Sequence, residues 1–193
     1  MRKLLFILFF LTAIPAGAFL ALYSKAWWRA GEPPPIPLLP IGDIRAPEPL
    51  SSYHPDRVVV VKTQRRLYLY DGDMPVLSYP IALGGNPLGH KQQEGDQRTP
   101  EGRYVLDYRN PNSRFYRSIH ISYPNSADKA RARKRGVSPG GEIFIHGLPN
   151  GMGWAEGWAH AFDWTDGCIA VSNRHMDELW ATVKNGTPIE IRP

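Results

Sequence analysis

The segment Asp163-Trp164-Thr165-Asp166-Gly167-Cys168-Ile169-Ala170-Val171-Ser172-Asn173 contains the only cysteine of this 193-residue chain. A second segment, Glu142-Ile143-Phe144-Ile145-His146-Gly147, has the pattern of a short apolar strand that ends at a histidine. We expect the two segments to meet in space, with Cys168 as a nucleophile and His146 as its general base. A free thiol has a pKa of about 8.5, so a neighbouring imidazole is needed to take its proton and leave an ion pair.

Glycines flank both of these residues. Gly167 lets the chain turn sharply before Cys168 and lets a substrate approach the backbone. The amides of Gly167 and Cys168 would then face a developing oxyanion, and a backbone carbonyl would fix the ring of His146. The alternative is that Cys168 is a small buried hydrophobe, which is the commoner role of a lone cysteine.

The charge of the chain is only weakly positive. Residues 1–50 carry five basic and three acidic side chains, a net +2, and residues 51–193 carry eighteen and fifteen, a net +3. This excess is far smaller than the charge of a nucleic-acid-binding surface, so no nucleic acid partner is expected. It is compatible with an anionic substrate. Length and 42% hydrophobic residues suit one folded domain plus an additional segment.

Residues 4–23 form an uncharged stretch that, as a helix, would span about 30 Å, the thickness of a bilayer core. Two tryptophans and two basic residues follow within 25–29, as at a membrane interface. Residues 1–30 are therefore predicted to be a signal anchor, and a signal peptide cleaved near 16–18 is the alternative. Both place the rest of the chain in the cell envelope, on the periplasmic side of the inner membrane. An unpaired thiol kept in that oxidising space is expected to have a use.

Seven prolines mark residues 31–52 as a stiff, extended linker, and residues 53–193 are expected to form the catalytic domain. Residues 148–162 form a loop rich in glycine and tryptophan. Helices are predicted from 125 to 135, ending at Gly136, and after an N-cap at Asn173. The count is seven or eight strands and two helices, so the fold is mainly β. Strands are predicted over 57–62, 64–70, 76–83, 103–106, 115–123, 142–147 and 187–192.

Three motifs resemble one known family. They are Thr99-Pro100-Glu101-Gly102, the strand that ends Ile145-His146-Gly147, and Gly167-Cys168-Ile169 followed by Asn173. Their order and placement resemble the L,D-transpeptidase catalytic domain (YkuD-like) over about residues 55–192. The resemblance implies a β-sandwich-like fold of mixed sheets, a thioester at the cysteine, peptidoglycan stem peptides as substrates and no cofactor. It assigns Cys168 as nucleophile, His146 as general base, the carbonyl of Gly147 as the group that orients the base, and the amide of Gly167 to the oxyanion hole.

The chain departs from the usual pattern of that family in three places. The separation 168 − 146 = 22 is longer than usual, Thr165-Asp166 replaces a common serine and histidine, and Ala170 stands where an arginine is common. These features resemble a branch that includes envelope enzymes that hydrolyse peptidoglycan crosslinks, among them the link to a lipoprotein. A carboxypeptidase or amidase acting on the same bonds therefore remains an alternative, and so does a non-catalytic envelope-binding module.

Further residues are candidates for substrate contact. Trp164, Thr165 and Asp166 precede the cysteine, His160 lies in the loop before them, and Tyr123 would form a pocket wall near a strand histidine. A zinc site built from two histidines and Cys168 lacks the usual ligand spacings, so no metal is expected. Four basic residues at the end of the first helix are either solvated or grip substrate carboxylates: Arg131, Arg133, Lys134 and Arg135.

Overall fold

The computed structural model describes residues 44–45 and 50–193. The predicted anchor at 4–23 lies outside the described residues, and so does the proline-rich segment at 31–52 except for 44–45 and 50–52. All the elements below belong to the unit formed by Asp43–Pro193. Within the described part of the chain, no helix has the length and apolar character that crossing a bilayer requires.

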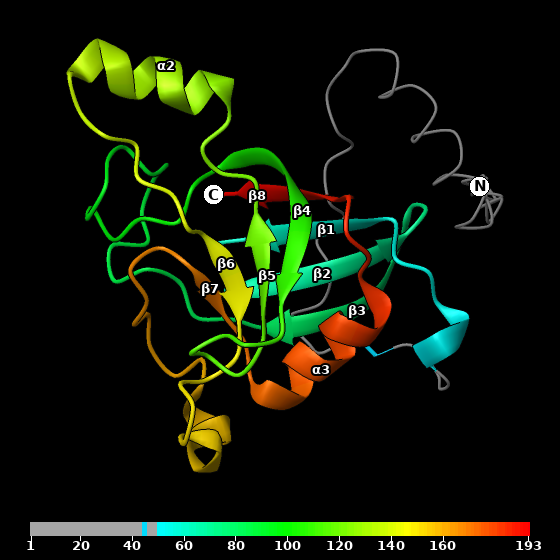
Figure 1. The fold of residues 1–193 in the computed structure, drawn as a ribbon. Coiled ribbons are helices and arrows are strands. Elements are labelled where there is room, and N and C mark those ends of the chain that lie inside the picture. The colour runs from blue at the N-terminus through cyan, green and yellow to red at the C-terminus, as the bar shows by residue number, and fades with distance from the viewer. Residues whose placement is uncertain (1–43, 46–49) are drawn as a thin grey trace, which may run out of the picture. The chain divides into compact units, whose positions relative to one another are not determined.

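Eight strands form one mixed sheet in the order β3-β2-β1-β8-β4-β5-β6-β7 (Figure 1). The pairs β1–β8 and β6–β7 are parallel, and the other neighbours are antiparallel. The strands are β1 (Arg57–Val61), β2 (Arg66–Asp71), β3 (Met74–Pro80), β4 (Gly102–Asn110), β5 (Ser118–Ile121), β6 (Phe144–His146), β7 (Ile169–Ala170) and β8 (Thr187–Arg192).

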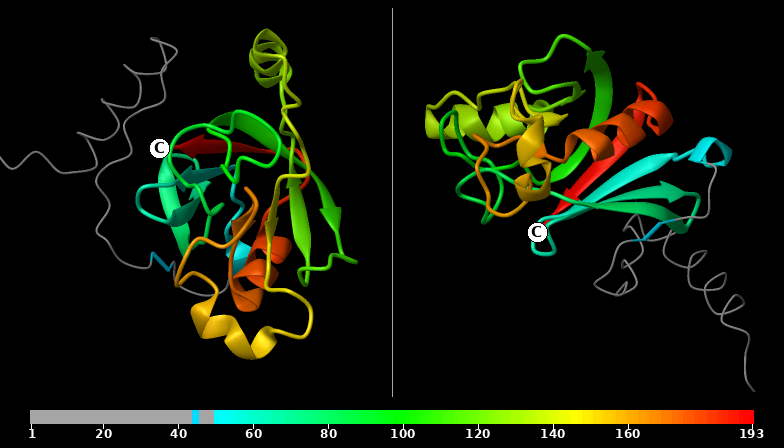
Figure 2. Two further views of the ribbon diagram at one scale, coloured as in Figure 1. Left: turned by 90° about the vertical axis from the view of Figure 1, so that its left-hand side faces the viewer. Right: turned by 90° about the horizontal axis from the view of Figure 1, so that it is seen from below.

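The sheet curls until its two edges meet (Figure 2). The chain just after β3 bonds to β7, because Ala82 and Ala170 exchange two backbone hydrogen bonds of 2.9 Å. A second bridge joins Gly84 to Thr165. The mainly β class is thus confirmed, but one curled sheet takes the place of sandwich-like sheets. As a result, the segment around Cys168 is held by backbone bonds on both sides.

The core fills the inside of this curl. All of Val58–Val61 and Leu67–Tyr70 are buried, the pattern of strands covered on both faces. Helix α3 (Asn173–Thr182) adds Met176 and Leu179, which have no exposed surface and belong to the same cluster. Each such side chain contributes about 2 kcal/mol to stability when fully buried. Helix α3 therefore stabilises the core through these side chains.

Helix α2 (Ser126–Arg135) has the predicted bounds because its end signals are local. Asn125 Oδ1 accepts from the Asp128 amide at 3.0 Å, and Asp128 Oδ2 accepts from the Asn125 amide at 2.9 Å, which completes a capping box. Gly136 ends the helix in the left-handed region. The helix projects beyond the end of the sheet (Figure 1) and buries only Asp128 and Ala132.

Several predicted details differ from the structure. Ser172, not Asn173, caps α3, and its hydroxyl accepts from the His175 amide at 3.2 Å. The Asn173 side chain is used elsewhere, because its Oδ1 accepts from the Leu148 amide at 2.9 Å. The predicted strand at 115–123 is shorter, since Tyr116 at φ +62° breaks the extended backbone. The loop at 148–162 contains a 3₁₀ segment, η3 (Gly153–Trp158).

Candidate active site

His146 is the last residue of β6, and Cys168 comes just before β7, which is the parallel neighbour of β6. Ile145 lies opposite Ile169, and His146 lies opposite Ala170. Because side chains alternate along a strand, Cys168 and His146 project from the same face, offset by two residues. Strand spacing and rise put their Cα atoms about 8 Å apart. The pairing of β6 with β7 therefore places Cys168 and His146 on the same side of the sheet.

The ring of His146 is fixed and almost completely buried, with 3% of the residue exposed. Its Nδ1 lies 2.7 Å from the carbonyl oxygen of Gly147. A carbonyl can only accept, so Nδ1 holds the proton and Nε2 keeps its lone pair. Phe115 and Trp164 pack against the ring at centroid distances of 4.5 and 5.7 Å. Burial lowers the pKa of His146 to about 4, against the opposing effect of the Gly147 carbonyl.

Gly147 occupies a position that has no room for a side chain. Its amide donates to the carbonyls of Phe115 and Arg117, at 3.2 Å each. A Cβ built there would lie 2.6 Å from Asn173 Oδ1 and 3.0 Å from Tyr116 Cβ. Gly147, whose carbonyl bonds to His146, is thus held between α3 and the loop before β5. The sequence indicates Asn173 as a helix cap and as part of the family motif, but it does not predict this contact with Gly147 or the hydrogen bond to Leu148.

Cys168 is partly exposed, and its Sγ lies 3.6 Å from the carbonyl oxygen of Glu142. Burial raises the pKa of the Cys168 thiol, the Phe144 amide opposes that rise, and the negative charge of Asp166 adds to it. Burial thus favours the neutral form of each group, the thiol of Cys168 and the imidazole of His146. It disfavours both charges of the ion pair expected from the sequence, and that pair stays a prediction.

The turn before the cysteine is held by one hydroxyl. Thr165 Oγ1 donates to the Cys168 carbonyl at 2.7 Å and accepts from the Gly167 amide at 3.1 Å. Gly167 sits at φ +131°, and a Cβ there would lie 2.7 Å from the Arg98 carbonyl oxygen. The Gly167 amide therefore has a partner in this structure, and it must leave Thr165 before it can bind an oxyanion.

The other residues predicted to contact substrate differ in their burial and in their partners. Trp164 packs on His146 and donates its Nε1 hydrogen to the Ala159 carbonyl at 3.1 Å. Asp166 and His160 are exposed. Tyr123 is buried, its ring meets Tyr104 edge-on, and its hydroxyl donates to the Pro139 carbonyl at 2.9 Å, so its contact with substrate stays a prediction.

An ion pair outside the predicted set anchors the catalytic segment. Asp163 accepts from Arg65 Nε at 3.0 Å and from its terminal nitrogen at 2.7 Å, and it also accepts from the Leu83 amide at 2.9 Å. Arg65 lies in the turn between β1 and β2, 98 residues earlier. Only the position of Asp163 at the start of the motif could have suggested a role, and the sequence offers no sign of its partner.

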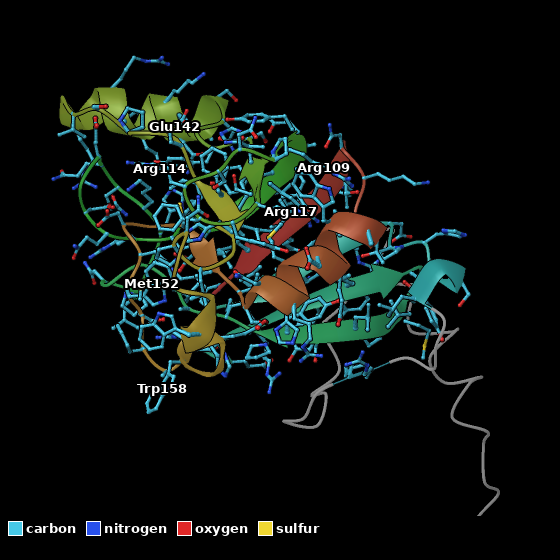
Figure 3. All side chains as sticks on the ribbon, turned by 60° about the horizontal axis from the view of Figure 1, so that its bottom comes forward. Arg109, Arg114, Arg117, Glu142, Met152 and Trp158 are labelled. Atoms are coloured by element: carbon cyan, nitrogen blue, oxygen red, sulfur yellow. The ribbon has the colours of Figure 1, made fainter. Side chains whose placement is uncertain are left out.

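The loop between His146 and Cys168 carries a group of exposed apolar side chains. Met152 and Trp158 lie on it, and Trp158 projects outward (Figure 3). Trp154 is 81% exposed. Among residues 44–45 and 50–193, no three His, Cys, Asp or Glu side chains are grouped so that they could hold a metal ion.

The curled mixed sheet and the adjacent Cys–His strands define a domain of the L,D-transpeptidase catalytic type. Residues 55–191 match the family model of the L,D-transpeptidase catalytic domain, YkuD. The chain belongs to this family.

Relatives whose names include L,D-transpeptidase support this membership. YafK of Escherichia coli strain K12 is 31% identical over 135 residues, which cover 67% of this chain and 47% of YafK. YkuD of Bacillus licheniformis is 30% identical over 155 residues, which cover 79% of this chain and 73% of YkuD. This chain thus spans about half the length of YafK.

Solved structures show the same fold. The helical cell shape determining protein Pgp2 of Campylobacter jejuni superposes with a TM-score of 0.53 at 28% identity, covering 69% of this chain and 46% of Pgp2. Bd1075 of Bdellovibrio bacteriovorus gives a TM-score of 0.51 at 26% identity, covering 80% of this chain and 53% of that one.

Proposed function

We propose that this chain is a cysteine acyltransferase of the L,D-transpeptidase type that acts on peptidoglycan stem peptides. One observation carries the proposal: the Gly147 carbonyl accepts a 2.7 Å hydrogen bond from Nδ1 of His146, which therefore keeps its proton on Nδ1. This leaves Nε2 as a base on the face from which Cys168 projects. Family membership and the partial exposure of the sulfur support the same conclusion.

The reaction begins with a neutral pair. As Sγ of Cys168 attacks the peptide carbonyl carbon, its proton passes to Nε2 of His146, so no free thiolate is needed beforehand. The carbonyl oxygen becomes an oxyanion, which the amides of Cys168 and Gly167 stabilise once Gly167 leaves Thr165. His146 then gives its proton to the leaving amine, and the acyl group remains on Sγ as a thioester.

A second nucleophile completes the cycle. An incoming amine attacks the thioester, His146 takes a proton from it, and the thiol of Cys168 leaves with that proton. From the family resemblance, the acyl group belongs to the residue with the meso-diaminopimelate side chain and the first leaving group is D-alanine. Trp164 and Asp166 beside the thiol, with His160 on the preceding loop, are the proposed substrate contacts. Tyr123 would act only through the packing around Pro139.

Water is the second candidate acceptor, which would make the chain a carboxypeptidase or amidase. The observation in its favour is the departure from the family pattern at Asp166 and Ala170. Ala170 is fully buried and its backbone is bonded to Ala82, so this position presents no polar group to an acceptor amine. An amidase of this kind would release a lipoprotein linked to peptidoglycan.

The proposed substrate places the domain in the cell envelope, on the periplasmic side. Residues 4–23 would anchor it to the inner membrane, and residues 31–52 would hold the domain away from the bilayer. Both proposals rest on the sequence pattern, and the last part of the second segment belongs to the described domain, because Arg45 pairs with Leu77 of β3.

Incubation with defined muropeptides, followed by mass spectrometry, tests the proposal. Crosslinked dimers or exchanged D-amino acids indicate transfer, and shortened peptides alone indicate hydrolysis. Cys168→Ala should fold normally and form neither product. Equal activity of that variant would refute the cysteine mechanism. A folded wild-type protein whose Cys168 does not react with a carbapenem would instead favour a non-catalytic envelope-binding module.

A further inference from the structure

A polar cavity of about 410 Å³ lies beside the catalytic turn. It is formed by the loop that connects β3 to β4 and by the end of α2, and Figure 1 shows that loop on the side of β6 and β7 toward α2. The Arg98 carbonyl lies so close to Gly167 that a Cβ there would approach it to 2.7 Å. The cavity is lined by Asn86, Gln92, Gln93, Asp96, Arg98 and Arg135.

Internal contacts neutralise the one acid of this lining. Asp96 accepts from Lys91 Nζ at 2.8 Å and from the amides of Gln92, Gln93 and Arg98 at 2.6 to 3.1 Å. The side chain of Lys91 is 3% exposed, so this ion pair is directed inward. The charge that the cavity presents to a ligand is therefore that of its two arginines.

The two arginines come from different elements and are held differently. Arg135 is the last residue of α2, and it donates to Gln92 Oε1 across the cavity. The backbone of Arg98 is fixed by Asp96, while its guanidinium makes no hydrogen bond or ion pair with residues 44–45 or 50–193. An aligned backbone with an uncommitted guanidinium suits bidentate binding of a carboxylate.

The walls of the site are also anchored to each other. The Glu94 amide donates to the Ser138 carbonyl at 2.9 Å, and the Ser138 hydroxyl donates to Glu94 Oε2 at 3.0 Å. Gly140 packs on Glu94, since a Cβ there would lie 3.2 Å from the Glu94 Cα. The carboxylate of Glu94 is thus bonded to the segment after α2. This contact ties the loop that carries Arg98 to the segment that follows Arg135.

We propose that this cavity binds a free carboxylate on the amino acid residue next to the bond that Cys168 attacks, with Arg98 as its bidentate partner and Arg135 as a second cation. The side-chain amides of Asn86, Gln92 and Gln93 match the amide groups of a peptide. The inference deepens the proposed function and rests on it, because it specifies which stem peptides the site takes.

Two peptides that differ only in this group test the proposal. One carries the free carboxylate beside the scissile bond, and in the other that carboxylate is amidated. We expect wild-type kcat/KM to favour the carboxylate peptide by at least about tenfold, the range for a hydrogen bond to a charged group. Arg98→Gln should bring the ratio of the two kcat/KM values close to one. Arg98→Lys, which keeps the charge but loses the planar fork, should give an intermediate ratio.

Arg133→Gln is the matched control. Arg133 is exposed in the last turn of α2, as Arg135 is, but it does not line the cavity. It should keep the wild-type ratio. An Arg98→Gln variant that slows both peptides equally would show a merely structural role and overturn the proposal. An equal loss of preference in Arg133→Gln would overturn it as well, because the preference would then come from general surface charge.

Binding measurements separate this proposal from the proposed function. If the wild-type protein processes neither peptide, calorimetry with Cys168→Ala still compares their affinities. Tighter binding of the carboxylate peptide that disappears in Cys168→Ala/Arg98→Gln would support the cavity while the enzymatic function fails. Equal binding of both peptides to Cys168→Ala would overturn the cavity proposal even if wild-type activity is present.

Discussion

Charges of both signs surround the Cys168 thiol, and its reactivity depends on their balance. Burial raises its pKa, and the carboxylates of Asp166 and Glu142 act in the same direction, while the Phe144 amide and the Lys91 ammonium act against it. Asp166 is exposed and makes no hydrogen bond that holds the catalytic turn, so its charge can be removed without disturbing the fold.

Asp166→Asn should therefore lower the pKa of Cys168. The midpoint of the pH profile for alkylation by iodoacetamide should move to lower pH, because a thiolate no longer faces a neighbouring negative charge. Asp73→Asn, in the exposed turn between β2 and β3, is the control and should leave the midpoint in place. A midpoint that stays constant or rises in Asp166→Asn contradicts this account of the thiol's surroundings.

Gly167 is constrained by both its backbone angle and its neighbours. A side chain there would adopt φ +131° and meet the Arg98 carbonyl oxygen at 2.7 Å. Gly167→Ala should reduce the free energy of unfolding by about 3 kcal/mol, the combined cost of strain and overpacking. Gly157→Ala is the comparison, since nothing lies within 4 Å of a Cβ at that position, and its effect should stay within about 0.5 kcal/mol. Urea unfolding measures the free energy of unfolding of both variants. Similar losses of stability in the two would show that Gly167 is not constrained in this way.

At the scale of elements, one buried lysine holds the loop that carries the polar cavity. Lys62 follows β1, and its Nζ donates to Gly89 O at 2.7 Å, Thr99 O at 3.2 Å and Glu101 Oε1 at 2.8 Å. Its side chain is 3% exposed. Burial lowers its pKa, and the hydrogen bond and charge of Glu101 act in the opposite direction. The loop from β3 to β4 thus depends on a charge supplied by β1.

Lys62→Met should cost about 2 kcal/mol of stability, because two carbonyls and a carboxylate lose their donor while the packing volume is nearly kept. The matched surface pair is Arg103 with Glu190, which are 3.9 Å apart, with the arginine side chain 63% exposed. Arg103→Met should cost no more than about 0.5 kcal/mol. Chemical denaturation of the two variants gives the comparison. A Lys62→Met protein as stable as Arg103→Met would show that the loop needs no such anchor.

Elements with local signals were predictable from the sequence, and elements with distant partners were not. The bounds of α2 follow from Asn125, Asp128 and Gly136, which lie within twelve positions of each other. The meeting of the sheet edges depends on Ala82 and Ala170, two residues that carry no pairing signal. The same distinction explains why the sequence indicated several mixed sheets and the structure has one.

The residues of the candidate site also divide into those with a local sequence signal and those that depend on distant partners. Cys168 and His146 could be selected because one is unique in the chain and the other ends an apolar strand before glycine. Their supports could not be selected, since the Arg65–Asp163 pair and the Asn173–Leu148 hydrogen bond join residues 98 and 25 positions apart. The pKa values of Cys168 and His146 also depend on burial, so the directions of their shifts could be recognised only in the folded domain.

At the scale of the whole molecule, the buried imidazole links the site to acid stability. The pKa of His146 falls to about 4 in the folded domain, below its ordinary value of about 6.5. The unfolded chain therefore binds a proton at a higher pH than the folded chain does. The contribution to stability is complete above about pH 6.5 and is lost as the pH falls through that value toward 4.

This difference in pKa lowers the free energy of unfolding by about 3 kcal/mol between pH 7 and pH 4. His146→Gln should remove that part of the pH dependence, so its free energy of unfolding should fall less steeply over this range than that of the wild type. The comparison is between slopes, because the substitution also changes packing at every pH. His54→Gln, at an exposed position before β1, should keep the wild-type slope. Urea denaturation at half-unit intervals from pH 7 to 4 measures all three proteins. If His146→Gln loses stability as steeply as the wild type, burial does not lower the pKa of His146 in the folded domain, and the base proposed for the thiol of Cys168 would be protonated below about pH 6.5.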